Sequence, residues 1–389
     1  MKVRIPLAKP EITEADRDAV LDVLRTPYLS MGPKLAEFEQ AICDYVGCKY
    51  AVAVNSGTSA LHIAVRALGL ERGAEVILPS FTFSALLNVI LQEGLRPKLV
   101  DIDPGTYNTT PEMVAAAITP QTRLILAVHT FGFPVDVKSI AEGAKGSRNS
   151  RARGHTAHVI EDACEALGAE VGMRKAGSIG DAGLFAFYPN KQITTGEGGV
   201  LVTSSEQLGS DARKLRNQGR DPKLDWLQHV EIGFSYRISD INCALGVSQL
   251  QRIENVIERR QKLTWIYDHE LANSCEVHRP PLTSKGGRIS WFVYPIRLGK
   301  EFTRADRDWI CESMLRKGIA TGRYFAPLHL QPVLASSIGQ GKSELRLPQT
   351  EFVADRIIAL PFFNELTEKE IQEVCGALEE SIGELRRKT

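Results

Sequence analysis

From about residue 50 to about residue 203 the chain alternates short apolar runs with longer segments of helical periodicity. The apolar runs are YAVAVN, EVILPS, RPKLVDID, TRLILAVH, HVIEDA, DAGLFAF and GGVLVTS. Near-continuous apolar runs of this length are typical of strands buried on both faces, and strands separated by helices form βαβ units. The pattern therefore predicts an α/β fold with a mostly parallel sheet flanked by helices.

A smaller unit follows this alternating region. With 389 residues the chain is long enough for two domains, since a domain usually holds about 100–200 residues. After a predicted helix over residues 241–272 the rhythm becomes looser, with a strand at SWFVYPIRL and helices near 304–317 and 367–386. We expect an N-terminal arm over residues 1–14, a large cofactor-binding domain over 15–250 and a small C-terminal α/β domain over 251–389.

The balance of charges argues against several classes of partner. The 47 Lys and Arg residues equal the 47 Asp and Glu residues, so the chain has no net field to attract nucleic acid or an acidic membrane surface. The N-terminus lacks a signal-peptide core, and no stretch approaches the roughly 18 apolar residues of a membrane helix. We expect a cytoplasmic protein. Seven scattered cysteines without CxxC spacing predict reduced thiols, with neither disulfides nor a metal site.

The segment NSGTSALH, at residues 55–62, follows one of the apolar runs and opens a helical pattern. Gly57 and Thr58 therefore fall at a helix N-terminus, where free backbone N–H groups and the positive end of the helix dipole can bind phosphate. Gly57 would also let the backbone approach a ligand closely. The alternative is ordinary capping of the helix by a Ser or Thr hydroxyl.

A second candidate lies in HVIEDACEALGA, at residues 158–169, where Asp162 follows a predicted buried strand. A carboxylate at a strand end is costly unless it has a partner. A protonated ring nitrogen would be such a partner, and ionised Asp162 would keep that nitrogen protonated so that the ring can accept electrons. The alternative is that Asp162 caps a following helix.

Two further side chains could complete a cofactor site. Phe83, in LPSFTFSALLN, could lie flat on a heteroaromatic ring, although it could equally belong to the core. Lys191 follows a predicted strand in GDAGLFAFYPNKQITTGEGGVLVT, within a loop rich in Thr and Gly. A lysine in a restricted pocket can lose its proton and bond to an aldehyde, whereas an isolated lysine in a turn would simply be solvated.

The order of these four features along the chain decides between the alternatives. A glycine-flanked phosphate site, a stacking aromatic residue, a strand-end aspartate and a loop lysine follow one another as in pyridoxal 5′-phosphate (PLP) enzymes with a parallel sheet. Their coincidence favours a cofactor site over four unrelated structural roles. The sequence therefore predicts PLP as the cofactor, with Lys191 as its point of attachment.

Segments along nearly the whole chain also resemble a known family. The matching stretches are IPLAKPEITE, YLSMGPKLAEFE, NSGTSALH, VILPSFTF, VIEDACEALGA, FYPNKQITTGEGG, GFSYRISDINCALGVSQL, SWFVYPIRL and YFAPLHLQP. They are similar to the DegT/DnrJ/EryC1/StrS sugar aminotransferases, which are PLP-dependent transferases of fold type I. The resemblance implies the same architecture, with a large cofactor domain and a smaller C-terminal one.

The resemblance also implies which residues hold the cofactor. Within one subunit they are Lys191 for the covalent bond, Asp162 for the pyridine nitrogen, Phe83 for the ring face, Gly57 and Thr58 for the phosphate, and Glu165 beside the ring. In the family the GFSYR segment reaches the phosphate of the neighbouring subunit. That implies a homodimer with shared active sites and gives the role to Ser235.

For the substrate, the resemblance points to Arg323, Tyr324 and His329 in GRYFAPLHLQP, which match a segment near the nucleotide in relatives. An arginine would suit a diphosphate because its planar fork bonds oxygens in pairs. Each of the three could instead be an interdomain contact.

Three positions depart from the family pattern. Ala186 stands where the family often has Ser, Ser235 where it often has Asn, and Glu165 where it usually has His or Gln. The first two changes remove or shorten a phosphate donor, and Glu165 adds a second carboxylate near the cofactor. The basic segment 143–156, GAKGSRNSRARGHT, is also longer than usual and could be an anion-binding patch or a solvated insertion.

The implied reaction moves an amino group from L-glutamate to a nucleotide-linked keto sugar, with Lys191 moving the proton. A sugar dehydratase is the nearest alternative, but those relatives have His in place of the lysine. A non-catalytic regulatory homologue is the alternative from another class, and no DNA-binding segment supports it. The sequence does not rank the possible sugars, ring carbons, nucleotides or pathways.

Overall fold

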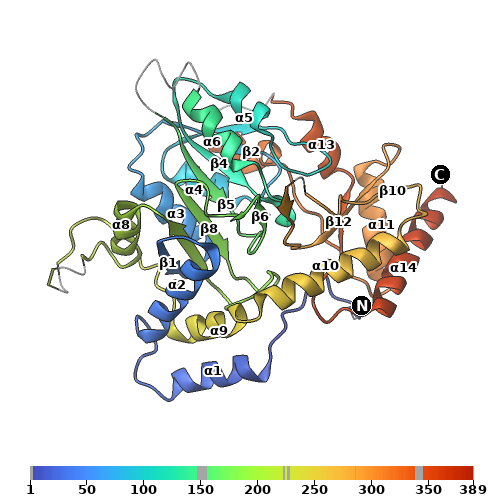
Figure 1. Cartoon of the computed structure of the whole chain (residues 1–389). Coiled ribbons are helices and arrows are strands. Elements are labelled where there is room, and N and C mark those ends of the chain that lie inside the picture. Colours follow the sequence, from blue (N-terminus) through green and yellow to red (C-terminus); the bar gives the residue numbers. More distant parts are fainter. Residues whose placement is uncertain are drawn as a thin grey trace.

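A seven-stranded sheet forms the centre of the molecule, in the order β1-β9-β8-β5-β4-β2-β3 (Figure 1). The computed structural model describes residues 3–146, 156–221, 224–225, 228–284, 286–337 and 345–388. The strands from β8 to β3 pair in parallel, and β9 runs opposite to both of its neighbours. The predicted fold class, α/β with a mostly parallel sheet, is confirmed.

The strands of this sheet coincide with the seven apolar runs of the sequence. They are β1 (Tyr50–Val54), β2 (Glu75–Pro79), β3 (Arg96–Val100), β4 (Thr122–Val128), β5 (His158–Asp162), β8 (Ala182–Ala186) and β9 (Gly199–Thr203). Both faces of the sheet are buried. Since successive side chains of a strand point to opposite sides, each strand contributes apolar side chains to both faces. In β1, Val52 packs into one hydrophobic cluster, whereas Ala51 and Ala53 pack into another on the opposite face.

Helices cover the two faces of the sheet (Figure 1). One face carries α3 (Gly57–Ala67), α4 (Ala85–Gln92) and α8 (Glu206–Arg216), and the other carries α2 (Pro33–Val46), α5 (Pro111–Ala117), α6 (Val137–Gly146), α9 (Asp240–Leu250) and α10 (Ile253–Glu270). The first helix, α1 (Glu14–Leu24), packs on α9, where Ser248 Oγ donates to Asp16 Oδ1 at 2.6 Å.

The single helix predicted over residues 241–272 is wrong, because the chain forms α9 and α10 with a break between them. The break lies at Gln251 and Arg252. Side chains at the break and just before it bond to Asp16 of α1: Arg252 at 3.0 Å and Gln249 Nε2 at 2.8 Å. The break lets α9 stay packed on α1 while α10 crosses to the C-terminal part of the molecule (Figure 1).

The C-terminal part is built on a smaller antiparallel sheet, in the order β10-β12-β13. Its elements are β10 (Val277–His278), β12 (Tyr294–Leu298), β13 (Ile357–Leu360), α11 (Arg304–Arg316), α13 (Pro348–Ala354) and α14 (Glu368–Arg386). Buried side chains such as Trp291, Tyr294 and Phe362 form its core. The strand predicted at SWFVYPIRL and the two predicted C-terminal helices therefore correspond to β12, α11 and α14.

Short elements connect the two parts. They are η1 (Thr130–Gly132), η2 (Leu328–Leu330), α12 (Pro332–Ser337), and a small sheet of β6 (Glu170–Val171), β7 (Arg174–Lys175) and β11 (Gly287–Arg288). The N-terminal segment also reaches the C-terminal part, since Ile5 pairs with Ile319. We propose the domains 15–250 and 251–389 with an arm over 1–14, because the large and the small sheet lie on opposite sides of residue 250 in the sequence.

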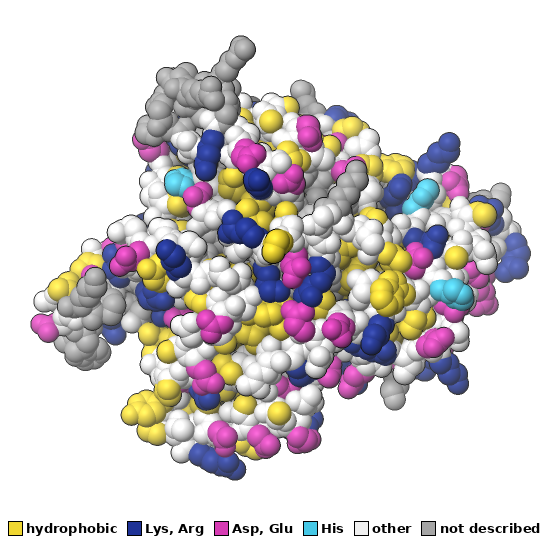
Figure 2. All heavy atoms as spheres, in the orientation of Figure 1, with side chains coloured by type: hydrophobic (Ala, Val, Ile, Leu, Met, Phe, Trp, Pro, Cys, Tyr) yellow, Lys and Arg dark blue, Asp and Glu magenta, His cyan; other side chains and the backbone are white. Residues whose placement is uncertain are grey.

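Over the described parts of the chain, no helix is long and apolar enough to cross a membrane, and no cluster of His, Cys, Asp or Glu side chains could hold a metal ion. All seven cysteines are free thiols. Figure 2 shows acidic and basic side chains interspersed over the face in view, in keeping with the charge balance of the sequence. Within the basic segment 143–156, residues 147–155 lie outside the described residues.

Candidate active site

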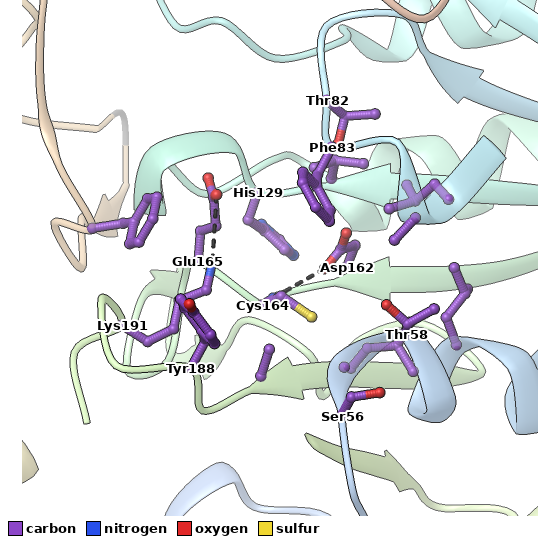
Figure 3. A pocket seen from close by; sticks show the side chains of 18 of the residues that line it. Ser56, Thr58, Thr82, Phe83, His129, Asp162, Cys164, Glu165, Tyr188 and Lys191 are labelled. Carbon is purple, nitrogen blue, oxygen red and sulfur yellow. Dashed lines mark hydrogen bonds and ion pairs between the residues drawn. The ribbon is translucent and has the colours of Figure 1, made fainter. Parts of the chain in front are cut away.

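A cavity of about 350 Å³ opens where the carboxyl ends of the parallel strands meet (Figure 3). The segments after β1, β2, β4, β5 and β8 line it, as expected for an open α/β sheet. Seven of the ten candidate residues line this cavity: Gly57, Thr58, Phe83, Asp162, Glu165, Lys191 and Tyr324. The fold thus brings six of the seven predicted cofactor residues together from four separate segments, and Tyr324 joins them from a fifth.

The N-terminus of α3 forms one end of the cavity. Ser56 caps the helix by accepting the N–H of Ser59 at 3.1 Å, so capping and anion binding are carried by different residues. Among the described residues no acceptor bonds to the N–H groups of Gly57 and Thr58. These two N–H groups and the helix dipole could hold a phosphate.

Gly57 has a second role, which sequence reasoning missed. A Cβ at this position would lie 2.7 Å from the Ala186 Cβ and 3.2 Å from Cys164 Sγ. The absence of a side chain therefore lets α3 sit directly against the end of β8. A serine at position 186 would be bulkier than Ala186 where β8 meets α3.

We expect Gly57→Ala to destabilise the protein by about 1–3 kcal/mol, because overpacking at a closed contact forces the backbone to move. Movement of the backbone at position 57 should also weaken PLP binding by about tenfold or more, because a tenfold change in Kd corresponds to only about 1.4 kcal/mol. Thermal unfolding and a PLP titration measure the two effects. Adding Ala186→Gly to Gly57→Ala removes the closest contact and should restore both the stability and the PLP affinity. A double variant as impaired as Gly57→Ala alone would refute the steric explanation.

Asp162 ends β5 and lies with its carboxylate at the cavity (Figure 3). Its Oδ1 accepts the N–H of Cys164 at 3.0 Å, and the chain continues in turns, so the alternative role as a helix cap is not what the fold shows. Figure 3 shows Phe83 and Cys164 on either side of Asp162 in this view. Phe83 is 60% exposed and lines the cavity, so it is not a core residue.

The neighbouring carboxylate, Glu161, faces away from the cavity and is fully buried. It accepts the N–H groups of Gly177 at 2.8 Å and Gly180 at 2.7 Å, and lies 3.0 Å from His129 Nε2. Burial raises the pKa of Glu161, but the bond from His129 and the backbone donors outweigh it and lower the pKa. Because His129 Nδ1 accepts the N–H of Val135 at 3.0 Å, Nε2 carries the hydrogen that Glu161 accepts.

Lys191 and Glu165 form an ion pair inside the cavity (Figure 3). Lys191 Nζ lies 3.5 Å from Glu165 Oε1, and the two side chains are only 13% and 14% exposed. The other carboxylate oxygen accepts the N–H of Phe131 at 2.9 Å. Burial and the nearby Asp162 charge raise the pKa of Glu165. The Lys191 charge and the Phe131 N–H lower it, but burial outweighs them, so the pKa stays above its usual value.

Several residues of the cavity were not found from the sequence. Phe292 lies 4.1 Å beneath Lys191 Nζ, and two buried oxygen atoms, Thr130 Oγ1 and Asn190 Oδ1, have no hydrogen-bond partner among the described residues. A buried polar atom without a partner costs about 1–3 kcal/mol, so these oxygens suit a bound ligand. Asn190 could have been suspected as the neighbour of Lys191, but nothing in the sequence marks Phe292.

The residues present fit PLP. A flat, anionic aldehyde with a basic ring nitrogen needs a phosphate site, a carboxylate, an aromatic face and an amine. The cavity supplies these from the N-terminus of α3, Asp162, Phe83 and Lys191. Thr130 Oγ1 adds a polar contact that no described residue satisfies.

Three predicted residues lie outside the cavity. Ser235 is at the surface, in a bridge with Asn217, and Arg323 is 43% exposed with its Nε 3.2 Å from Asp308. His329 is buried, with Nδ1 2.7 Å from Ser80 Oγ. Tyr324 alone of the predicted substrate residues lines the cavity.

Comparisons with known proteins agree with this geometry. Residues 10–379 match the DegT/DnrJ/EryC1/StrS aminotransferase family. GDP-perosamine synthase of Caulobacter vibrioides is 37% identical over 379 residues, which cover 97% of this chain and 98% of that protein. The PLP form of Spr1654 from Streptococcus pneumoniae superposes with a TM-score of 0.90 at 26% identity, covering 98% of this chain and 99% of the other. Helicobacter pylori PseC, an aminotransferase of pseudoaminic acid biosynthesis, gives the same TM-score, identity and coverage.

Proposed function

Because the chain belongs to the DegT/DnrJ/EryC1/StrS aminotransferase family, a family of PLP-dependent sugar aminotransferases, we propose that it transfers an amino group from L-glutamate to a keto sugar linked to a nucleotide. The observation that carries the proposal is the position of Lys191, whose amine lies in the same cavity as Asp162 and the N-terminus of α3. A histidine would stand at this position in the dehydratases, so Lys191 favours transamination.

The cofactor residues in the cavity have defined tasks in this reaction. When bound, PLP supplies a ring that accepts electrons from the reacting carbon. Gly57 and Thr58 bind its phosphate, Phe83 covers the ring, and Asp162 holds a proton on the ring nitrogen. Lys191 anchors the cofactor between turnovers and, once released by the amino donor, takes up and returns a proton at Nζ.

The substrate residues support the proposal to different degrees. Tyr324 lies in the wall of the cavity, packed against Phe292 at a ring distance of 6.2 Å. Arg323 pairs with Asp308 at the surface, and a diphosphate could replace that carboxylate as its partner. His329 holds Ser80, three residues before Phe83, so we propose that it acts on the substrate through this segment.

We also propose that the working unit is a homodimer in which Ser235 completes the phosphate site of the neighbour. Exposed apolar side chains lie around this segment: Val230 and Ile232 before it, and Tyr28, Leu29 and Met31 in the loop that bridges to Ser239. Exposed apolar side chains near this segment favour contact with another protein surface. Light scattering at assay concentration checks the mass of the active form.

The experiment that tests the proposed function is a panel of nucleotide-linked 3-keto and 4-keto sugars assayed with L-glutamate. A GDP-linked keto sugar comes first, because a relative at 37% identity is a GDP-perosamine synthase. We expect an amino sugar from at least one member of the panel, together with 2-oxoglutarate in equal amount. If no member is aminated although glutamate converts the absorbance of the bound cofactor, the sugar-nucleotide part of the proposal fails.

A further inference from the structure

The Lys191–Glu165 pair has a feature that binding of the cofactor does not explain. Glu165 belongs to the turn after β5, and its two oxygens are divided between Lys191 Nζ at 3.5 Å and the Phe131 N–H at 2.9 Å. The backbone bond fixes the carboxylate in place and leaves one oxygen directed at the amine. The ring of Phe292, 4.1 Å from Nζ, also favours a positive charge there.

We propose that Glu165 is a positioning residue that holds the Lys191 amine in place and stabilises the proton that Nζ takes up during the reaction. The inference rests on the proposed function in so far as Lys191 moves a proton there. The step balances: the C–H bond of the amino donor breaks, its electron pair passes to the ring that bound PLP would supply, and the proton bonds to the lone pair of Nζ beside Glu165 Oε1. Nζ would then give this proton to a carbon of the cofactor, so the lysine ends the step unchanged. Glu165 itself neither gains nor loses a proton.

The other charged and titratable groups around the pair do not replace Glu165. Asp162 ends β5 and Cys164 lies on the same turn as Glu165. Burial raises the pKa of the Cys164 thiol well above its usual value, and the Asp162 charge adds to this. From the C-terminal part, Tyr324 is neutral, since burial and the Glu165 charge both raise its pKa. Arg260 donates to the backbone carbonyl of Lys191 at 3.4 Å and not to Nζ.

Glutamine at position 165 is the informative change. Its amide oxygen can still accept the Phe131 N–H, while its NH₂ group then faces Lys191 without a charge. Glutamine is also a residue that the family commonly has at this position, so the variant should fold. Without the opposite charge beside it, Nζ should lose its proton more readily and react faster with an acylating reagent.

The test is acetic anhydride labelling of the full-length protein, freed of cofactor, over a range of pH, with the Lys191 peptide quantified by mass spectrometry. At neutral pH, labelling of Lys191 should be about tenfold faster or more in Glu165→Gln and in Glu165→Ala than in the parent protein. Glu165→Asp keeps the charge and should stay closer to the parent. Glu365→Gln removes an exposed carboxylate that pairs with Lys9, and it should leave the labelling profile unchanged.

Identical labelling profiles for Lys191 in the parent, Glu165→Gln and Glu165→Ala would overturn the inference, because a merely structural role for Glu165 would not move the profile. This outcome is distinct from failure of the proposed function. Labelling needs neither glutamate nor a sugar, so the sugar panel can fail while the labelling shift is present, and the reverse is equally possible.

Discussion

Lys191→Ala is expected to lower turnover by about a thousandfold or more while the protein stays folded. Proton transfer by a positioned side chain contributes about 10²–10⁴ to a rate, and this variant also loses the attachment of the cofactor. The side chain contacts Glu165 and the ring of Phe292, and within the described residues it bonds to no backbone group. Its loss leaves Glu165 able to take up a proton, because burial raises the pKa of that carboxyl group.

Three measurements check this expectation. Steady-state assays give the loss of turnover, thermal unfolding shows whether the fold is kept, and borohydride should fix the cofactor on the peptide with Lys191 in the parent protein alone. Lys138→Ala serves as the matched control, since Lys138 is an exposed lysine paired only loosely with Glu142 at 4.0 Å. Turnover at the parental rate in Lys191→Ala would end the assignment of Lys191.

Asp162→Asn is expected to keep the fold and most of the cofactor affinity but to slow the chemical step by about a hundredfold or more. The asparagine oxygen can still accept the N–H of Cys164, so the turn after β5 is preserved. The change removes the charge that keeps a proton on the ring nitrogen. Since that interaction strengthens as charge develops on the reacting carbon, its loss should affect the chemical step more than binding.

The decisive measurement for Asp162 is the half-reaction with glutamate, followed by absorbance in a single turnover with PLP saturating. Asp103→Asn is a suitable control, because Asp103 Oδ1 forms a similar turn by accepting the N–H of Gly105 at 3.0 Å, and it does not line the cavity. The control should react at the parental rate. If Asp162→Asn does so as well, its carboxylate only holds the turn.

Two departures from the family pattern acquire a physical meaning from the structure. Ala186 packs against Gly57 so closely that the pair must be considered together. Glu165 places a carboxylate beside Lys191, where an uncharged Gln would leave the amine without an anionic partner. Both departures change the cofactor site without changing which cofactor it fits.

The amino-acid sequence determined the sheet and the main cofactor residues. All seven strands of the large sheet coincide with apolar runs, because a strand buried on both faces needs apolar side chains on both. Gly57, Asp162 and Lys191 were found because each lies at a short distance in sequence from a strand end. The carboxyl ends of parallel strands meet at one edge of a sheet, so such residues converge whatever the details of packing.

Only the tertiary structure decided the contacts between segments far apart in the sequence. Alternation along β5 places Glu161 and Asp162 on opposite faces, but which of them reaches the cavity depends on the position of the neighbouring strands. The place of Phe292 beneath Lys191 and the burial of His329 against Ser80 depend on how the C-terminal part packs on the sheet. Such contacts leave no periodic signal in a single sequence, because neither partner constrains the local backbone of the other.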